Sequence, residues 1–153
     1  MIKNTGTEEA QCLGKLVLLV TAHPDDEAMF FVPTIKTLLH AHINTRIHLL
    51  CLSSGNYEGL GQIRKKELRQ ACSFIGIHNL EIVEHEKLQD GMQNTWPLDL
   101  ISSIVSKYVK EKGINMVSYL LAALFMMVIL KNMYYKSSPI QITTRAKFLY
   151  CKV

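Results

Sequence analysis

A buried strand that ends in a histidine and three acidic residues is the feature that most constrains this chain. Residues 16–31 read LVLLVTAHPDDEAMFF, so an unbroken Leu and Val run leads through a Thr-Ala pair into His23, Pro24, Asp25, Asp26 and Glu27. Such an apolar run is typical of a strand buried on both faces of a parallel sheet. Proline cannot donate a hydrogen bond to a neighbouring strand, so we expect the strand to end at or before His23. The sequence therefore predicts an α/β fold that delivers one imidazole and three carboxylates to a ligand-binding sheet edge.

These polar residues allow two interpretations. In the first, Asp25 or Asp26 caps a helix that begins near Glu27, where the helix dipole favours acidic side chains. In the second, His23 and one aspartate bind zinc, while the other aspartate deprotonates a metal-bound water. The carboxylates alone fit both interpretations equally, and the adjacent histidine favours the second.

Strand and helix patterns alternate along the chain that follows. Apolar spacing predicts helices over 27–42, 61–75 and 96–112, and short apolar runs predict strands over 44–53, 80–83 and 114–117. Pro33 falls inside the first of these helices, so this helix either starts late or is kinked. The alternation indicates a layered, Rossmann-like α/β fold with a mostly parallel sheet. A nucleotide-binding module has the same coarse pattern, but the sequence contains neither GxGxxG after the first strand nor GxxxxGK[ST].

Composition narrows the partners and the compartment. The 153 residues suffice for one domain with a core, and a net charge of +4 gives no indication of a nucleic-acid partner. The four cysteines are Cys12, Cys51, Cys72 and Cys151, with no CxxC pair among them. We expect Cys51 and Cys72 to be buried free thiols, which suits a reducing, cytosol-facing location. Residues 1–14 are polar and predict a flexible lead-in without a signal peptide or membrane anchor.

The string AHPDDE after an apolar strand resembles the LmbE-like, zinc-dependent de-N-acetylases. The longer string VTAHPDDEAMFFVPTI is most similar to the members of this family that deacetylate N-acetylglucosaminyl-phosphatidylinositol, the second step of GPI-anchor biosynthesis. The resemblance extends over residues 15–117. It implies an LmbE-type fold in which His23 and Asp26 bind Zn²⁺ and Asp25 is the catalytic general base.

The resemblance also implies substrate contacts, which we expect from Arg64, Glu67 and Asp90. Arg64 and Glu67 are three residues apart near the start of the predicted helix over 61–75, so both can lie on one side of it. Asp90 is the best match in the polar loop over 84–96, where His85 and Glu86 compete with it on composition. The implied substrate is a glycolipid on the cytosolic face of the endoplasmic reticulum membrane, so membrane association is expected.

The family pattern ends near residue 117. The family continues into a loop with paired histidines of the form HxxH, which supplies a third metal ligand and stabilises the oxyanion, whereas this sequence has no histidine after His85. We therefore expect a partial LmbE-like domain over 15–117, incomplete at its C-terminal end, and a divergent apolar then basic tail over 118–153. Residues 114–130 carry no charge, which predicts either a buried strand followed by a core helix or a minimal membrane-spanning helix.

Two functional hypotheses follow. The first is a zinc-dependent hydrolase that removes the acetyl group from N-acetylglucosaminyl-phosphatidylinositol. The second is a catalytically inactive, truncated variant that acts, if at all, through protein partners such as a full-length homologous chain. Stoichiometric zinc that depends on His23 and Asp26 would favour the first hypothesis, and absence of zinc would favour the second.

Overall fold

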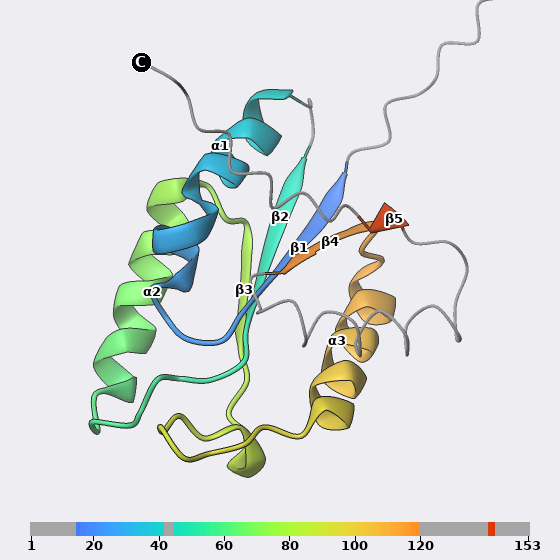
Figure 1. The fold of residues 1–153 in the computed structure, drawn as a ribbon. Coiled ribbons are helices and arrows are strands. Elements are labelled where there is room, and N and C mark those ends of the chain that lie inside the picture. The colour runs from blue at the N-terminus through green and yellow to red at the C-terminus, as the bar shows by residue number, and fades with distance from the viewer. Residues whose placement is uncertain (1–14, 42–44, 120–140, 143–153) are drawn as a thin grey trace, which may run out of the picture.

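A parallel sheet between two layers of helices forms the fold. The computed structural model describes residues 15–41, 45–119 and 141–142 (Figure 1). The sheet order is β3-β2-β1-β4-β5, and each neighbouring pair of strands runs parallel. Its strands are β1 (Leu16–Thr21), β2 (Arg46–Cys51), β3 (Asn79–Ile82), β4 (Met116–Tyr119) and β5 (Gln141–Ile142). The predicted α/β class with a mostly parallel sheet is confirmed.

Helices cover both faces of this sheet because β1 and β2 are apolar on both sides. A π-helical turn, η1 (Glu27–Phe31), leads into α1 (Val32–Ala41), and together with α2 (Gly61–Ile75) these helices pack on Val17 and Leu19. On the other face, α3 (Leu98–Lys112) packs on Leu18 and Val20. Figure 1 shows this arrangement, with α1 and α2 on one side of the strands and α3 on the other. The alternation of successive β1 residues between the two faces is the two-residue period of a strand.

The predicted helices differ from the observed ones mainly at their first residues. The helix over 61–75 is confirmed with the same bounds. The α-helix predicted from residue 27 begins only at Val32, so Pro33 lies in its first turn, where its missing N–H has no consequence. The helix predicted from residue 96 begins at Leu98, with Pro97 at the N-cap position, and ends at Gly113 as expected.

The predicted strands shift by small amounts. The strand predicted over 44–53 is observed over 46–51, and the one predicted over 80–83 lies one residue earlier. The strand predicted over 114–117 begins at Met116 and continues to Tyr119. An unpredicted fifth strand pairs Gln141 and Ile142 with β4. These shifts leave the sheet topology unchanged.

Several predictions concern residues outside the described part of the chain. These include the flexible lead-in over 1–14, the fate of residues 120–130, and Cys12 and Cys151; the division of the chain into segments also remains a prediction. In the described part, Cys51 and Cys72 are buried free thiols, as expected. Across residues 15–41, 45–119 and 141–142, no helix has both the length and the apolar character needed to cross a membrane.

Candidate active site

The turn after β1 is held together by its own carboxylates. Asp26 Oδ2 accepts hydrogen bonds from the backbone N–H groups of Ala22 and His23, both at 3.0 Å. Glu27 Oε2 accepts a bond from the backbone N–H of Asp25, also at 3.0 Å. Helix capping, one of the two interpretations offered for Asp25 or Asp26, is not observed at Asp26: this residue occupies the N-cap position of η1, yet its side chain makes no capping bond because it turns back onto the strand end.

Asp25 has an unusual backbone conformation. Its φ is +101°, the only positive value at a non-glycine residue in the described part of the chain. Its carbonyl oxygen accepts bonds from the N–H groups of Ala28 and Met29 at 2.9 and 3.0 Å. Its side chain is 60 % exposed. Left-handed backbone at a non-glycine residue is costly and clusters at functional sites, so the conformation itself indicates a functional turn.

Glu27 is the buried member of the acidic triplet, with only 1 % of its surface exposed. Burial disfavours the charged carboxylate and raises the pKa of Glu27, and the nearby charges of Asp25 and Asp26 act in the same direction. Backbone hydrogen bonds to the carboxylate partly offset this effect. The three adjacent carboxylates therefore occupy three different environments.

Arg64, on the first turn of α2, links this turn to the loop after β2. Its Nη2 donates to the carbonyl oxygen of Pro24 at 2.8 Å and to Asp25 Oδ2 at 3.1 Å, while Nη1 donates to the carbonyl oxygen of Gly55 at 3.0 Å. A Cβ atom placed at Gly55, whose φ is +65°, would lie 2.3 Å from Arg64 Nη1. Glycine at this position is thus required both by the backbone and by the close approach of the guanidinium group.

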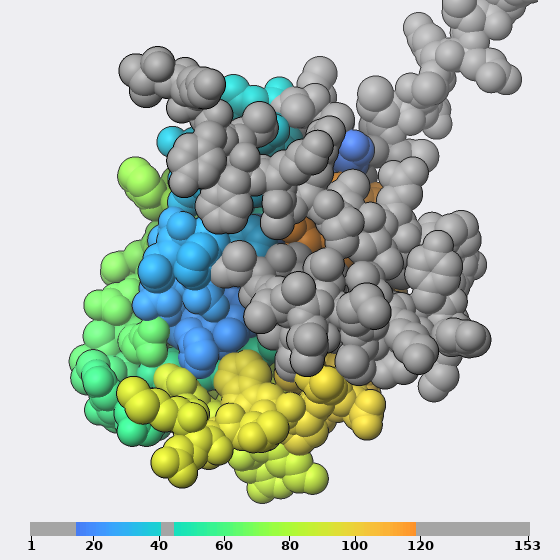
Figure 2. Space-filling model, viewed as in Figure 1, coloured from blue at the N-terminus to red at the C-terminus, as the bar shows by residue number. Residues whose placement is uncertain are grey.

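The loop after β3 brings Asp90 to the same place. Asp90 Oδ1 lies 3.0 Å from His23 Nε2, and its Oδ2 lies 3.9 Å from Arg64 Nη1. Trp96 lies beside His23, with ring centroids 5.6 Å apart, and its Nε1 donates to the carbonyl oxygen of Gln89 at 2.9 Å. The space-filling view in Figure 2 shows this yellow loop segment packed below the blue segment that follows β1.

A pocket opens beside these residues, between the loops that follow β2 and β3. Its lining includes Ser53, Ser54 and Asn56 from the first loop and Glu84, His85 and Asp90 from the second. The pocket is therefore lined largely by hydrogen-bonding groups.

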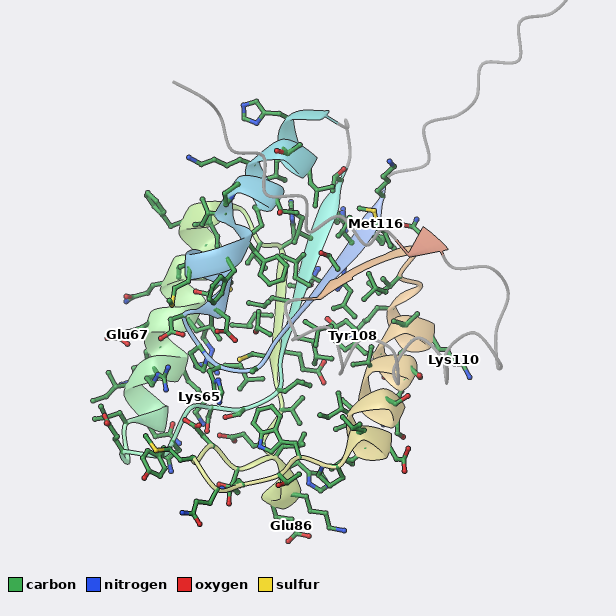
Figure 3. The ribbon with its side chains drawn as sticks, viewed as in Figure 1. Lys65, Glu67, Glu86, Tyr108, Lys110 and Met116 are labelled. Atoms are coloured by element: carbon green, nitrogen blue, oxygen red, sulfur yellow. The ribbon has the colours of Figure 1, made fainter. Side chains whose placement is uncertain are left out.

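The structure brings five of the six predicted site residues together and places the sixth elsewhere. His23, Asp25 and Asp26 share the turn, and Arg64 and Asp90 reach it from α2 and from the loop after β3. Glu67 is exposed, and Figure 3 shows it on the outer side of α2, pointing away from the sheet. The expectation that Arg64 and Glu67 lie on one side of the helix is thus wrong. The side of α2 that carries Leu68 is buried, and Glu67 is exposed to solvent.

Two further histidines have local structural roles. His85 Nδ1 accepts a bond from the backbone N–H of Lys87 at 3.0 Å at the start of a 3₁₀ turn, η2 (Glu86–Leu88). Buried His48 contacts Tyr108 Oη through Nδ1 at 3.1 Å and Asn79 Nδ2 through Nε2 at 3.2 Å. His48 is therefore a core histidine whose two ring nitrogens both have polar partners.

The turn after β1 contains some, but not all, of the ligands that a zinc site requires. His23 and Asp26 are of the residue types that bind zinc, but a catalytic zinc site normally has three protein ligands. Among the residues that the structure describes, no group of three or more His, Cys, Asp or Glu side chains is arranged to hold a metal ion. By residue type, His23 and Asp26 are thus candidates for two positions of such a site, and the described residues do not provide a third.

Sequence reasoning missed three contributors to this site, namely the Glu27 bond to the Asp25 backbone, the ring contact of Trp96, and the close approach at Gly55. The first two have no signal in local sequence, because they depend on how the turn and the loop fold. The string SSGN around Gly55 allows either turn chemistry or hydrogen bonds to a substrate, and neither predicts the close approach of Arg64. The additional role of Gly55 follows from Arg64, nine residues later, reaching back over it.

Comparisons with known proteins identify the family and the relatives of this chain. Residues 18–122 match the family described as "PIG-L: GlcNAc-PI de-N-acetylase". The chain is 45 % identical over 106 residues to N-acetylglucosaminyl-phosphatidylinositol de-N-acetylase of Bos taurus, covering 68 % of this chain and 41 % of the relative. It is 51 % identical over 98 residues to the probable enzyme of that name from Schizosaccharomyces pombe, covering 60 % and 39 % respectively. The chain thus spans about two fifths of the length of these relatives.

The fold is also shared with a solved deacetylase. N,N'-diacetylchitobiose deacetylase from Pyrococcus horikoshii superimposes with a TM-score of 0.56 at 20 % identity, covering 67 % of this chain and 39 % of that one. At this identity the likeness concerns the fold alone. The family match over most of the described residues, together with the AHPDDE turn at the end of β1, shows that the chain belongs to the GlcNAc-PI de-N-acetylase family.

Proposed function

We propose that this chain is a zinc-dependent deacetylase that removes the acetyl group from N-acetylglucosaminyl-phosphatidylinositol in GPI-anchor biosynthesis. The observation that carries the proposal is the turn after β1, where Asp25, His23 and Asp26 stand at the sheet edge in a member of this family. Relatives that carry the name of this activity are 45 % and 51 % identical over the matched residues. Because the chain covers only part of these relatives, their activity is assigned to it as a proposal.

The residues divide the proposed chemistry among them. His23 and Asp26 would hold two positions of a divalent metal, which when bound polarises the amide carbonyl and lowers the pKa of a coordinated water. Asp25 would accept the proton of the attacking water and return it to the leaving amine. Its carboxylate suits this role because Arg64 fixes Oδ2 while 60 % of the side chain stays open to solvent and substrate. Asp90 and Arg64 would contact the sugar.

Deacetylation of N-acetylglucosaminyl-phosphatidylinositol by the purified chain tests this proposal, together with its zinc content. Asp25→Asn should abolish turnover, whereas His23→Ala and Asp26→Ala should also remove bound zinc. Asp99→Asn is the matched control, because it makes the same chemical change at an exposed aspartate in the first turn of α3. Turnover that is unaffected by Asp25→Asn would contradict the assignment of the general base.

A catalytically inactive chain is the second candidate. It is favoured by one observation: the described residues contain no three-ligand metal cluster. Absence of zinc above background and of turnover in the wild-type chain would support it. Such a chain would act through protein partners, and mixing it with a full-length family enzyme in a sedimentation experiment would show whether the two associate.

Membrane association at the cytosolic face of the endoplasmic reticulum is part of the first proposal. It is supported by exposed apolar side chains on the two loops that contribute residues to the pocket lining: Tyr57, Leu60 and Met92 are 61 %, 44 % and 92 % exposed. Tyr57 Cδ2 lies 3.5 Å from the position of a Cβ atom at Gly91, so the two loops that carry these side chains are adjacent. A lipid surface would cover them while presenting a phosphatidylinositol headgroup to the pocket.

Sedimentation with phosphatidylcholine vesicles that contain phosphatidylinositol tests this membrane association. Met92→Ser should lower the bound fraction of the chain. Phe74→Ser is the control, because Phe74 is also 92 % exposed but lies near the far end of α2, about 20 Å along the helix from Gly61. Equal losses of the bound fraction in the two variants would contradict the proposed contact, since they would show that vesicle binding does not depend on where the exposed apolar side chain lies.

A further inference from the structure

The carboxylate of Glu27 contacts the backbone of the residue that the proposed mechanism uses as its base. Glu27 Oε2 accepts the N–H of Asp25 at 3.0 Å, although the two residues are only two positions apart. The Glu27 side chain does not reach solvent, since the residue is 1 % exposed, whereas the Asp25 side chain is 60 % exposed. The buried Glu27 carboxylate thus holds the backbone N–H of Asp25, the residue whose own carboxylate is exposed.

This contact matters because Asp25 is held in a backbone conformation that it would otherwise avoid. Its φ of +101° is in the region that favours glycine. Such conformations persist only when the surrounding structure holds them. The N–H of Asp25 is held by Glu27, and its carbonyl oxygen by the N–H groups of Ala28 and Met29. The direction in which the Asp25 side chain leaves the backbone is set by φ and ψ, so these bonds also set the direction of the carboxylate.

We propose that Glu27 is a positioning residue that aims the Asp25 carboxylate by holding the Asp25 backbone N–H. The effect on catalysis rests on the proposed function, whereas the effect on the Asp25 backbone does not. The alternative is a merely structural role, in which the buried side chain of Glu27 fills space between η1 and the sheet. The two roles differ in what they require: positioning needs an acceptor oxygen at this place, and space filling needs only volume.

Substitutions at Glu27 separate these requirements. Glu27→Gln keeps a side-chain oxygen at the same distance from the backbone and removes the charge. Glu27→Met keeps the length and much of the volume but has no comparable acceptor. Glu27→Asp keeps the acceptor and shortens the side chain by one methylene, and so serves if the Met variant does not fold. Ile35→Ala is the control for lost stability alone, because Ile35 lies on α1, is fully buried in the core cluster and is not part of the turn.

Hydrogen exchange at the Asp25 amide is the first readout, and it does not depend on activity. Relative to the wild type, Glu27→Met should speed exchange of this amide at least tenfold, whereas Glu27→Gln should leave it within threefold. In the deacetylation assay, Glu27→Met should lower kcat about 100-fold with little change in KM, because misplacing a reacting group affects the chemical step. Ile35→Ala should lower the urea midpoint of unfolding and leave kcat and KM unchanged.

Each outcome decides the matter. Asp25 exchange and kcat that are unchanged in Glu27→Met would overturn the proposal and leave Glu27 as a packing residue. Equal losses in Glu27→Gln and Glu27→Met would overturn it too, since they would show that charge and not an acceptor oxygen is required. If the wild-type chain has no turnover, the proposed function fails, while the exchange comparison still tests whether Glu27 holds the Asp25 backbone.

Discussion

Gly55→Ala should destabilise the chain far more than a comparable glycine replacement, because two independent effects meet at this position. The φ of Gly55 is +65°, and a Cβ atom there would lie 2.3 Å from Arg64 Nη1 and 2.7 Å from its Cζ. The first effect is the backbone term: a left-handed backbone conformation costs a non-glycine residue about 1–2 kcal/mol in stability. The contact adds a second term, since the guanidinium group must move and lose its present partners.

The second term follows from the bonds of Arg64. The group donates to the carbonyl oxygens of Gly55 and Pro24 and to Asp25 Oδ2. Bonds from a charged donor contribute about 1.5–3 kcal/mol each when fully buried. Because the Arg64 side chain is 27 % exposed and that of Asp25 is 60 % exposed, we reduce this to about 0.5–1 kcal/mol each. The sum is about 2 kcal/mol, so Gly55→Ala should cost about 3–4 kcal/mol in total.

Urea unfolding of four chains tests this reasoning: wild type, Gly55→Ala, Arg64→Met and the double variant. In the Arg64→Met background the Cβ atom meets no guanidinium group, so Gly55→Ala should cost only the backbone term of about 1–2 kcal/mol. Gly59→Ala is the matched control, because Gly59 has a φ of +76° and nothing within 4 Å of the added atom. Effects of Gly55→Ala that agree in both backgrounds to within about 0.5 kcal/mol would refute the argument, since additivity indicates that the two sites do not interact.

Three further predictions concern the core. Burial lowers the pKa of His48, and nearby positive charges such as that of Lys112 act in the same direction. The folded state therefore binds fewer protons than the unfolded state at acidic pH. The free energy of unfolding should consequently fall as the pH drops below about 6.5. Urea midpoints between pH 5 and pH 8 should show a slope that is smaller in His48→Gln, and an unchanged slope would contradict the assignment. Burial raises the pKa of Cys51 to about 11 and that of Cys72 to about 12, so neither thiol should react with iodoacetamide at pH 8 until the chain unfolds; rapid labelling of the folded chain would contradict this. Ile35→Ala should cost about 2–5 kcal/mol in urea unfolding because it leaves a cavity in a fully buried cluster, and a loss below about 1 kcal/mol would mean that the site is loosely packed.

The order of elements could be predicted from the sequence because each is fixed by a local pattern. The Leu and Val run before His23 gave β1, and the apolar face of residues 61–75 gave α2 with the observed bounds. Pro33 marked the place where regular α-helix starts, although the π-helical turn before it has no recognisable signal. Helix and strand ends shifted where the deciding interaction is made with a distant segment, as in β4, which is paired with β1 and β5.

The internal bonds of the site could not be predicted in this way. The sequence leaves helix capping by Asp25 or Asp26 as one of two interpretations, and it does not predict that the Asp26 carboxylate accepts hydrogen bonds from the N–H groups of Ala22 and His23. The family resemblance predicts Glu67 at the site, and its spacing from Arg64 allows this, but only the packing of α2 shows that Glu67 faces outward. Asp90 was found through family resemblance, since nothing in its local sequence places it beside His23. Side-chain direction depends on tertiary packing, so spacing alone does not determine it.

The arrangement of Arg64 and Asp90 favours a shared role toward substrate for these two residues. Arg64 Nη2 donates hydrogen bonds to the carbonyl oxygen of Pro24 and to Asp25 Oδ2, and Nη1 donates one to the carbonyl oxygen of Gly55. The second hydrogen of Nη1 is left over from these bonds. Nη1 lies 3.9 Å from Asp90 Oδ2, which is too long for a hydrogen bond. A hydroxyl group between these two atoms would accept from Arg64 and donate to Asp90, each over about 2.8 Å. Sugar hydroxyls are groups of this kind, which supports the proposed contact of Arg64 and Asp90 with a sugar, whereas Glu67 lies on the outer side of α2 and points away from the sheet.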